Sequence, residues 1–141
     1  LFKNFRNKIK GFIGISSAPE FTEEIMWKNF SKEEKKIILK NKIYYLDNEY
    51  DTPYPITKNL IMDGRKNKIL DKKIYAKISV ILFHSLKDKL VPLKFSRKIL
   101  KLFKTQNKKI IKIKDGNHSL SREKDLRKIC SELRKIVINI T

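Results

Sequence analysis

Three short apolar runs, each rich in β-branched residues, constrain the fold of this chain more than any other feature. They lie at 11–16, 77–85 and 108–114, and each has the length of a buried strand. Apolar residues recur at helical spacing in two later segments, one beginning near Pro92 and one beginning near Ser121, a possible helix N-cap. Strands that alternate with helices in this way predict an α/β fold with a parallel sheet.

Residues 19–75, between the first and second predicted strands, differ from the rest of the chain in composition and apolar patterning. Aromatic residues and Met are scattered among charges, and Ser31 with Glu34 forms the sequence signature of a capping box before KKIILKN. The stretch DNEYDTPYPIT is rich in turn-forming residues. We therefore predict a helical insertion with an irregular middle at 19–75.

The net charge of +19 raises the possibility of a nucleic-acid partner. However, the basic residues are 28 Lys and only 6 Arg, and they are spread along the whole chain. Base recognition favours the bidentate Arg fork, and single-strand binding favours aromatic residues along a basic groove. Neither pattern forms a coherent motif here, so the composition favours a solvated, Lys-covered surface over nucleic-acid binding.

The single cysteine cannot form an internal disulfide, so nothing indicates an oxidising compartment. Cys130 lies on the apolar stripe of the last predicted helix, and we expect it to be buried. Lys or Arg recurs too often for an apolar stretch of membrane-spanning length. We therefore predict a cytoplasmic protein without a membrane span.

Two polar residues follow the last two predicted strands. Asp88 comes after the strand at 77–85, in HSLKDKLVP, and His118 comes after the strand at 108–114, in DGNHSLS. Ligands of parallel sheets bind beyond the carboxyl ends of the strands, where both residues are expected to lie. A carboxylate that accepts from one imidazole nitrogen leaves the other nitrogen free to take a proton from a nucleophile.

These stretches resemble the α/β-hydrolase superfamily of serine hydrolases. HSLKDKLVP looks like the HGxxDxxVP stretch that carries the acid of the catalytic triad, and DGNHSLS looks like the approach to the catalytic histidine. With GFIGISSAPEFTEEIMW and PYPITKNLIMDGR, the chain resembles bacterial relatives of the mitochondrial acyl-protein (palmitoyl) thioesterase that also acts as an acyl-glucuronide esterase. The resemblance makes Asp88 the acid and His118 the base. Ser85 departs from the pattern, because the superfamily usually has Gly there.

The nucleophile is expected on a G-x-S-x-G elbow that precedes the acid and the histidine. The nearest match is GISSA at 14–18, which ends in Ala and is followed by Pro19, where a helix should begin. We therefore interpret Ser16 and Ser17 as small residues at the end of a strand. The elbow is expected roughly ten to fifteen residues before Leu1, if the intervening helix has ordinary length.

The resemblance implies the C-terminal part of an α/β-hydrolase: three parallel strands, two flanking helices and a cap insertion at 19–75. The whole protein would cleave acyl esters or thioesters, and this chain alone would be inactive. The alternatives are a basic module that binds nucleic acid or an anionic surface, and a degenerate hydrolase without catalysis.

Other candidate residues carry less weight. Six residues of the insertion could line an acyl pocket, although packing of the insertion is the favoured interpretation: Met26, Trp27, Phe30, Tyr44, Tyr45 and Tyr54. His84 lacks other metal-ligand types at suitable spacing, so we predict no metal, and no cofactor is expected. Arg65 is expected to pair with Asp63 on a helix surface.

Overall fold

A computed structural model describes residues 8–47 and 52–138 of the chain, which divides into two compact units. One unit comprises Leu1–Ala18 and Leu70–Thr141, and the other comprises Pro19–Ile69. The second unit thus ends six residues before the predicted boundary at residue 75. The reason is that Ile74 forms a parallel bridge with Phe103, which ties the segment after Ile69 to the first unit.

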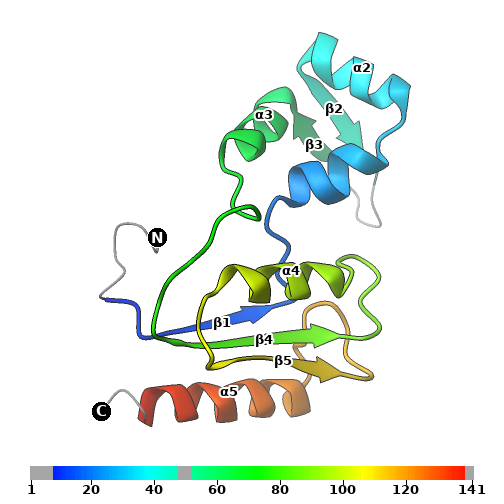
Figure 1. Cartoon of the computed structure of the whole chain (residues 1–141). Coiled ribbons are helices and arrows are strands. Elements are labelled where there is room, and N and C mark those ends of the chain that lie inside the picture. Colours follow the sequence, from blue (N-terminus) through cyan, green and yellow to red (C-terminus); the bar gives the residue numbers. More distant parts are fainter. Residues whose placement is uncertain (1–7, 48–51, 139–141) are drawn as a thin grey trace. The chain divides into compact units, whose positions relative to one another are not determined.

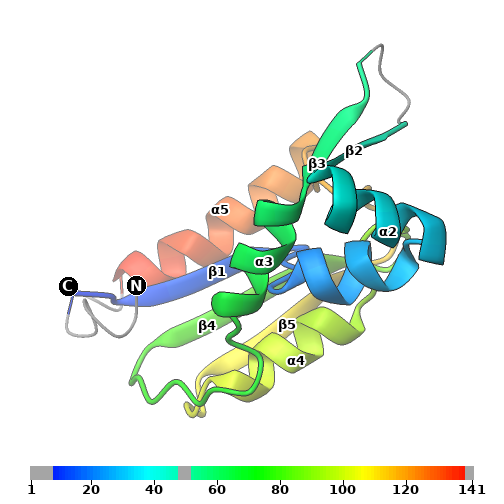
Figure 2. The ribbon, with the colours of Figure 1, turned by 90° about the horizontal axis from the view of Figure 1, so that it is seen from above.

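The first unit contains a parallel sheet of three strands in the order β1-β4-β5. These strands are β1 (Gly11–Ile15), β4 (Ser79–Ser85) and β5 (Lys108–Ile113), and they run side by side in the same direction (Figure 1, Figure 2). They coincide with the three apolar runs to within two residues at each end. The predicted α/β fold with a parallel sheet is therefore confirmed.

One helix covers each face of this sheet: α4 (Lys94–Leu102) on one side and α5 (Glu123–Ile138) on the other (Figure 1). The alternation of side chains along β4 explains the two layers. Val80 and Leu82 pack in a cluster with residues of α4, whereas Ile81 and Phe83 pack in a cluster with residues of α5. A strand buried on both faces reads as a continuous apolar run, as KISVILF does.

The orientation of α5 corrects the prediction for Cys130, which is exposed. The sheet-facing side of the helix instead carries Ile129 and Ile136 together with two buried acids, Asp125 and Glu132. Each acid has a basic partner: Arg122 for Asp125, and Lys109 and Lys135 for Glu132. The helix begins at Glu123, so Ser121 is not its N-cap residue, because the first helical hydrogen bonds are accepted by the carbonyl of Arg122.

The second unit is less helical than predicted. It contains a π-helix, η1 (Thr22–Trp27), two α-helices, α2 (Lys32–Asn41) and α3 (Lys58–Lys66), and an antiparallel hairpin of β2 (Ile43–Leu46) and β3 (Tyr54–Thr57). The hairpin was not predicted, because its strands are only four residues long and β3 lies within the turn-rich stretch DNEYDTPYPIT.

Local interactions of this unit confirm one prediction and correct another. The capping box is present, since the Ser31 hydroxyl accepts from the backbone N–H of Glu34 and the Glu34 carboxylate accepts from the N–H of Ser31. Arg65, however, pairs with Glu23 of η1 at 2.6 Å rather than with Asp63, and its guanidinium stacks on Trp27. Within the described ranges, no helix has the length and apolar character needed to cross a membrane.

Candidate active site

The loops that follow β4 and β5 bring Asp88 and His118 together. Nδ1 of His118 lies 2.8 Å from Oδ2 of Asp88, although thirty residues separate the two in sequence. The strands are parallel and adjacent, with Ser85 opposite Ile113, so their carboxyl ends reach the same edge of the sheet. The two candidate residues predicted from the sequence therefore form one hydrogen-bonded pair.

Asp88 is held as a buried carboxylate. Its side chain is fully buried, and Oδ1 accepts hydrogen bonds from the backbone N–H groups of Leu90 at 3.0 Å and Val91 at 2.9 Å. Burial by itself raises the pKa of Asp88, but the hydrogen bonds from Val91, His118 and Leu90 and the nearby Ser16 hydroxyl together bring that pKa below its ordinary value. Asp88 is consequently ionised at neutral pH and offers only acceptors.

His118 is oriented by this carboxylate. Because an ionised carboxylate can only accept, Nδ1 of His118 must carry the proton that joins the pair. Nε2 has no hydrogen-bond partner among the residues the structure describes, and the side chain is 39% exposed. Neutral His118 therefore presents an unprotonated Nε2 that can take a proton from a reacting group.

Ser85 connects the two loops. Its side chain is buried, its hydroxyl donates to the carbonyl oxygen of Gly116, and its oxygen accepts from the backbone N–H of Lys87 at 3.1 Å. Gly116 has no room for a side chain, since a Cβ there would lie 2.3 Å from a methyl carbon of the fully buried Leu120. The departure from the superfamily pattern at Ser85 thus provides a link between the acid loop and the histidine loop.

Arg122 anchors the loop that carries His118 from its other end. Its guanidinium pairs with Asp125 of α5 at 2.7 Å, donates to the backbone oxygen of Asp115 at 2.6 Å and approaches the Asp115 carboxylate. Hydrogen bonds from Lys124 and Arg122 lower the pKa of Asp115 well below its usual range. The segment from the end of β5 to the start of α5 is therefore fixed at both ends.

Ser16, the middle of the GISSA stretch, lies beside the candidate acid. It is buried, has a left-handed backbone with φ of 42°, and lies close enough to Asp88 to lower the pKa of that carboxyl. Its hydroxyl makes no hydrogen bond of normal geometry within the described residues. The next residues form a loop rather than the helix that follows a nucleophile elbow.

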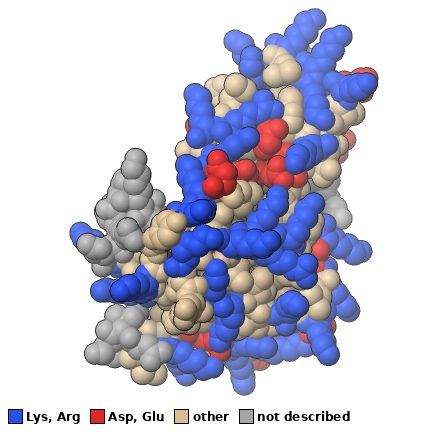
Figure 3. All heavy atoms as spheres, in the orientation of Figure 1, with Lys and Arg blue, Asp and Glu red and all other residues tan. Residues whose placement is uncertain are grey.

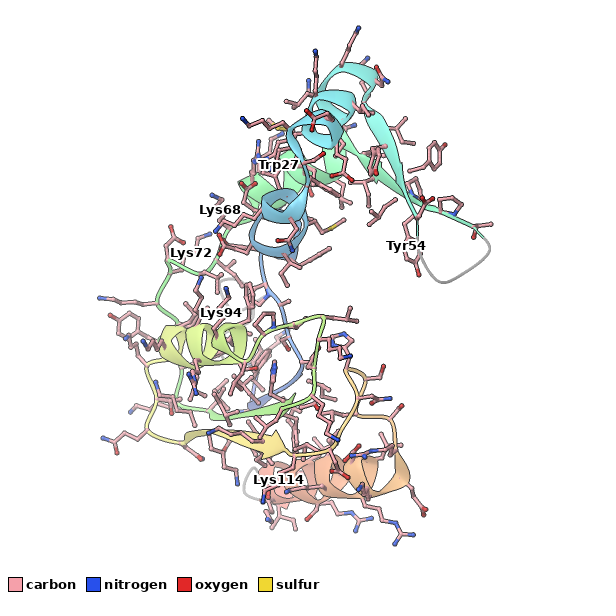
Figure 4. All side chains as sticks on the ribbon, turned by 90° about the vertical axis from the view of Figure 1, so that its right-hand side faces the viewer. Trp27, Tyr54, Lys68, Lys72, Lys94 and Lys114 are labelled. Carbon is pink, nitrogen blue, oxygen red and sulfur yellow. The ribbon has the colours of Figure 1, made fainter. Side chains whose placement is uncertain are left out.

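The six candidate pocket residues of the insertion divide into two groups. Four of them, Met26, Trp27, Phe30 and Tyr44, pack in the core of the second unit. Tyr45 and Tyr54 are instead 59% and 51% exposed, and Figure 4 shows Tyr54 at the end of the hairpin, apart from Trp27. This division supports packing as the role of the first four.

On the face that Figure 3 shows, the basic residues of the described ranges do not gather in one distinct patch. Lys and Arg side chains are scattered over the visible surface of both units, with only small groups of acidic residues between them (Figure 3). Among the described residues there is also no group of three or more His, Cys, Asp or Glu placed to hold a metal ion. The site therefore consists of Asp88, His118 and the groups that hold them.

Comparisons with known proteins bear on the fold. No family model and no curated protein matches the chain. Among solved structures, it is similar to one from Agrobacterium vitis S4 assigned as a hydrolase, with a TM-score of 0.82 and 23% identity, covering 90% of this chain and 49% of that one. It is also similar to mouse alpha/beta hydrolase domain-containing protein 10, with a TM-score of 0.83 and 18% identity, covering 99% of this chain and 56% of that one.

A third similar structure is Est1E from Butyrivibrio proteoclasticus with ferulic acid bound. The TM-score is 0.65 and the identity 21%, and the match covers 95% of this chain and 51% of Est1E. The chain thus spans about half the length of the solved structures it matches. At these identities the likeness concerns the fold, and it shows that this chain has the α/β fold of about half an α/β-hydrolase.

Proposed function

We propose that Asp88 and His118 are the acid and the base of the catalytic triad of a serine hydrolase. The observation that carries this proposal is the 2.8 Å hydrogen bond from Nδ1 of His118 to the buried carboxylate of Asp88. The pair lies beyond the carboxyl ends of two parallel strands, where sheets of this type bind their substrates. The hydrolase fold of the neighbours supports the same assignment.

In the proposed reaction, a serine hydroxyl attacks the carbonyl carbon of an acyl ester or thioester while Nε2 of His118 takes the hydroxyl proton. Asp88 keeps Nδ1 protonated and stabilises the imidazolium that forms. His118 then returns the proton to the leaving alcohol or thiol, which departs as the acyl-enzyme forms. A water molecule, activated by the same Nε2, releases the acid and restores the serine.

The serine that performs this attack belongs, in our proposal, to a polypeptide segment other than the one described. The buried Ser16 hydroxyl, which faces the acid rather than the base, supports this view, as does the coverage of about half of each neighbour. The backbone donors of the oxyanion hole accompany the nucleophile in this fold. This chain alone is therefore expected to lack hydrolase activity.

The proposed substrate class is an acyl ester or thioester. The resemblance of the sequence to bacterial relatives of the mitochondrial acyl-protein thioesterase supports it, and Est1E holds ferulic acid, a carboxylic acid of the kind that ester cleavage releases. The unit Pro19–Ile69 is inserted between β1 and β4, which supports its interpretation as a cap. No observation singles out a second function.

The proposal is tested with the chain extended upstream in its reading frame and treated with a fluorophosphonate. An activated serine displaces fluoride from phosphorus and becomes covalently labelled. We expect one labelled serine that precedes Leu1 in the sequence and loses most of its labelling in His118→Ala, with Asp71→Asn as an exposed control. A labelled Ser16, or labelling that is indifferent to His118, contradicts the proposal.

A further inference from the structure

His84 occupies a position that the proposed chemistry does not use. It is the sixth residue of β4, its side chain is almost completely buried, and it points to the same side of the sheet as Val80 and Leu82, toward α4. Both ring nitrogens have partners: Nδ1 lies 2.8 Å from Oγ of Ser96, and Nε2 lies 3.0 Å from the carbonyl oxygen of Val91.

These partners fix the tautomer of His84. A carbonyl oxygen can only accept, so Nε2 carries the proton and donates to Val91. Nδ1 is then unprotonated and accepts from the hydroxyl of Ser96, which lies in the first turn of α4, two residues after Lys94. Burial lowers the pKa of His84, so the neutral ring that this arrangement needs is the stable form.

Val91 joins this arrangement to the candidate active site. Its carbonyl accepts from His84, and its backbone N–H donates to Oδ1 of Asp88 at 2.9 Å. Asp88 in turn accepts from His118 through Oδ2. A continuous series of hydrogen bonds therefore runs from Ser96 on α4 through His84, Val91 and Asp88 to His118.

We infer that His84 is a positioning residue for the Asp88–His118 pair, acting through the backbone of Val91. The inference rests on the proposed function for its catalytic meaning, but the hydrogen bonds belong to this chain alone. The peptide that links Val91 to Pro92 has no N–H group, so the Val91 carbonyl is the polar group of that peptide that His84 can hold. Without the donor from His84, the Val91 N–H is free to turn away from Asp88.

The charged groups that act on His84 are Asp88, which favours its protonation, and His118, which opposes it. Variants must therefore separate the hydrogen bond from the charge. His84→Leu removes both hydrogen bonds, whereas His84→Gln keeps a terminal amide N–H at the position of Nε2. Ile99→Ala is the matched control, because Ile99 is buried on α4 one turn after Ser96 and packs in the cluster of Leu102 and Phe103.

The readout is NMR titration of the whole chain, which has only two histidines. In His84→Leu, we expect the carboxyl resonance of Asp88 to titrate about one pH unit higher than in the unaltered chain, because the amide donors are lost. His84→Gln is expected to restore most of the Asp88 midpoint, and Ile99→Ala to leave it unchanged.

An Asp88 midpoint that is the same in folded His84→Leu and in the unaltered chain overturns the inference. If His84→Leu does not fold, the ¹⁵N chemical shifts of the His84 ring in the unaltered chain test the inference instead. The inference requires Nε2 of His84 to be protonated and Nδ1 to be unprotonated at neutral pH. A proton on Nδ1 overturns the inference, because Val91 would then have no donor. None of these measurements depends on hydrolysis, so failure of the proposed function and failure of this inference can be told apart.

Discussion

Asp88 receives hydrogen bonds from three directions although its side chain is fully buried. A carboxylate taken out of water remains charged only if such donors replace the lost hydration. Two of the donors are backbone groups of its own loop, so the loop must have one particular conformation whenever Asp88 is ionised. The charge of one residue and the shape of one loop are thereby coupled.

This coupling predicts the pH dependence of stability. The pKa of Asp88 is lower in the folded chain than in the unfolded chain, so its contribution is complete above about pH 4 and is lost as the pH falls through the folded value. We expect Asp88→Asn to lower the free energy of unfolding by about 1–3 kcal/mol at pH 7. The difference from the parent chain should shrink on acidification, as followed by urea unfolding. The exposed Asp71→Asn serves as control, and an equal stability of Asp88→Asn and parent at pH 7 would contradict the account.

A second prediction at the residue scale concerns the role of Ser85 in linking the two loops. Ser85→Ala removes the donor to the Gly116 carbonyl and leaves that buried acceptor unpaired, so a loss of about 1–3 kcal/mol in the free energy of unfolding is expected. Amide hydrogens in 114–120 should exchange faster, because the histidine loop loses its link to the acid loop. Ser79→Ala at the start of the same strand is the control, since its hydroxyl meets the exposed Asn107. Unchanged exchange in 114–120 would show that Ser85 does not connect the loops.

At the scale of elements, apolar patterning was sufficient for the three strands of the sheet and for the presence of α4 and α5, but not for the rotation of α5 or for the hairpin. The sequences of β1, β4 and β5 are continuous apolar runs because helices cover both faces of the sheet. Such a run can be recognised within a single short segment of the sequence. The rotation of α5 was missed because its buried face includes Asp125 and Glu132, whose cations come from Arg122 and Lys109 as well as from the helix itself. No pattern within one helix shows that its acids will be neutralised from outside.

The candidate site divides in the same way. Asp88 and His118 were identified because strand order alone brings their loops to one edge of the sheet. The contributions of Ser16, His84 and Ser85 were not predicted, since each depends on a contact with another loop or helix. For His84, the sequence did offer an indication, since a histidine lies near the end of an otherwise apolar strand, shortly before Asp88.

The capping box of α2 gives a prediction for the second unit. Ser31→Ala removes the side-chain acceptor for the Glu34 N–H and should lower the free energy of unfolding by about 1 kcal/mol. The matched substitution Ser121→Ala, two residues before α5, should change it by only a few tenths of that amount, because Ser121 does not cap the helix. The two variants are compared by thermal and urea unfolding of the whole chain. If Ser121→Ala lowered the free energy of unfolding as much as Ser31→Ala, the sequence-based assignment of Ser121 as an N-cap would be correct after all.

At the scale of the whole molecule, the high positive charge is a property of the surface rather than of a site. Its Lys residues are distributed over both units. The candidate site, an acid hydrogen-bonded to an exposed imidazole, lies at one edge of the sheet. The chain spans about half of each hydrolase that it resembles. Under the proposed function, the nucleophile and the oxyanion donors come from a segment other than the described one.

The most direct test is the rate of hydrolysis of a p-nitrophenyl ester and an acyl thioester by the chain extended upstream in its reading frame. The account predicts that kcat/KM falls by about 10³-fold or more in His118→Ala and substantially in Asp88→Asn, while Asp71→Asn retains the parent rate. A parent rate retained in His118→Ala, in a protein that remains folded, would contradict the assignment of Asp88 and His118 as the acid and base of a hydrolase.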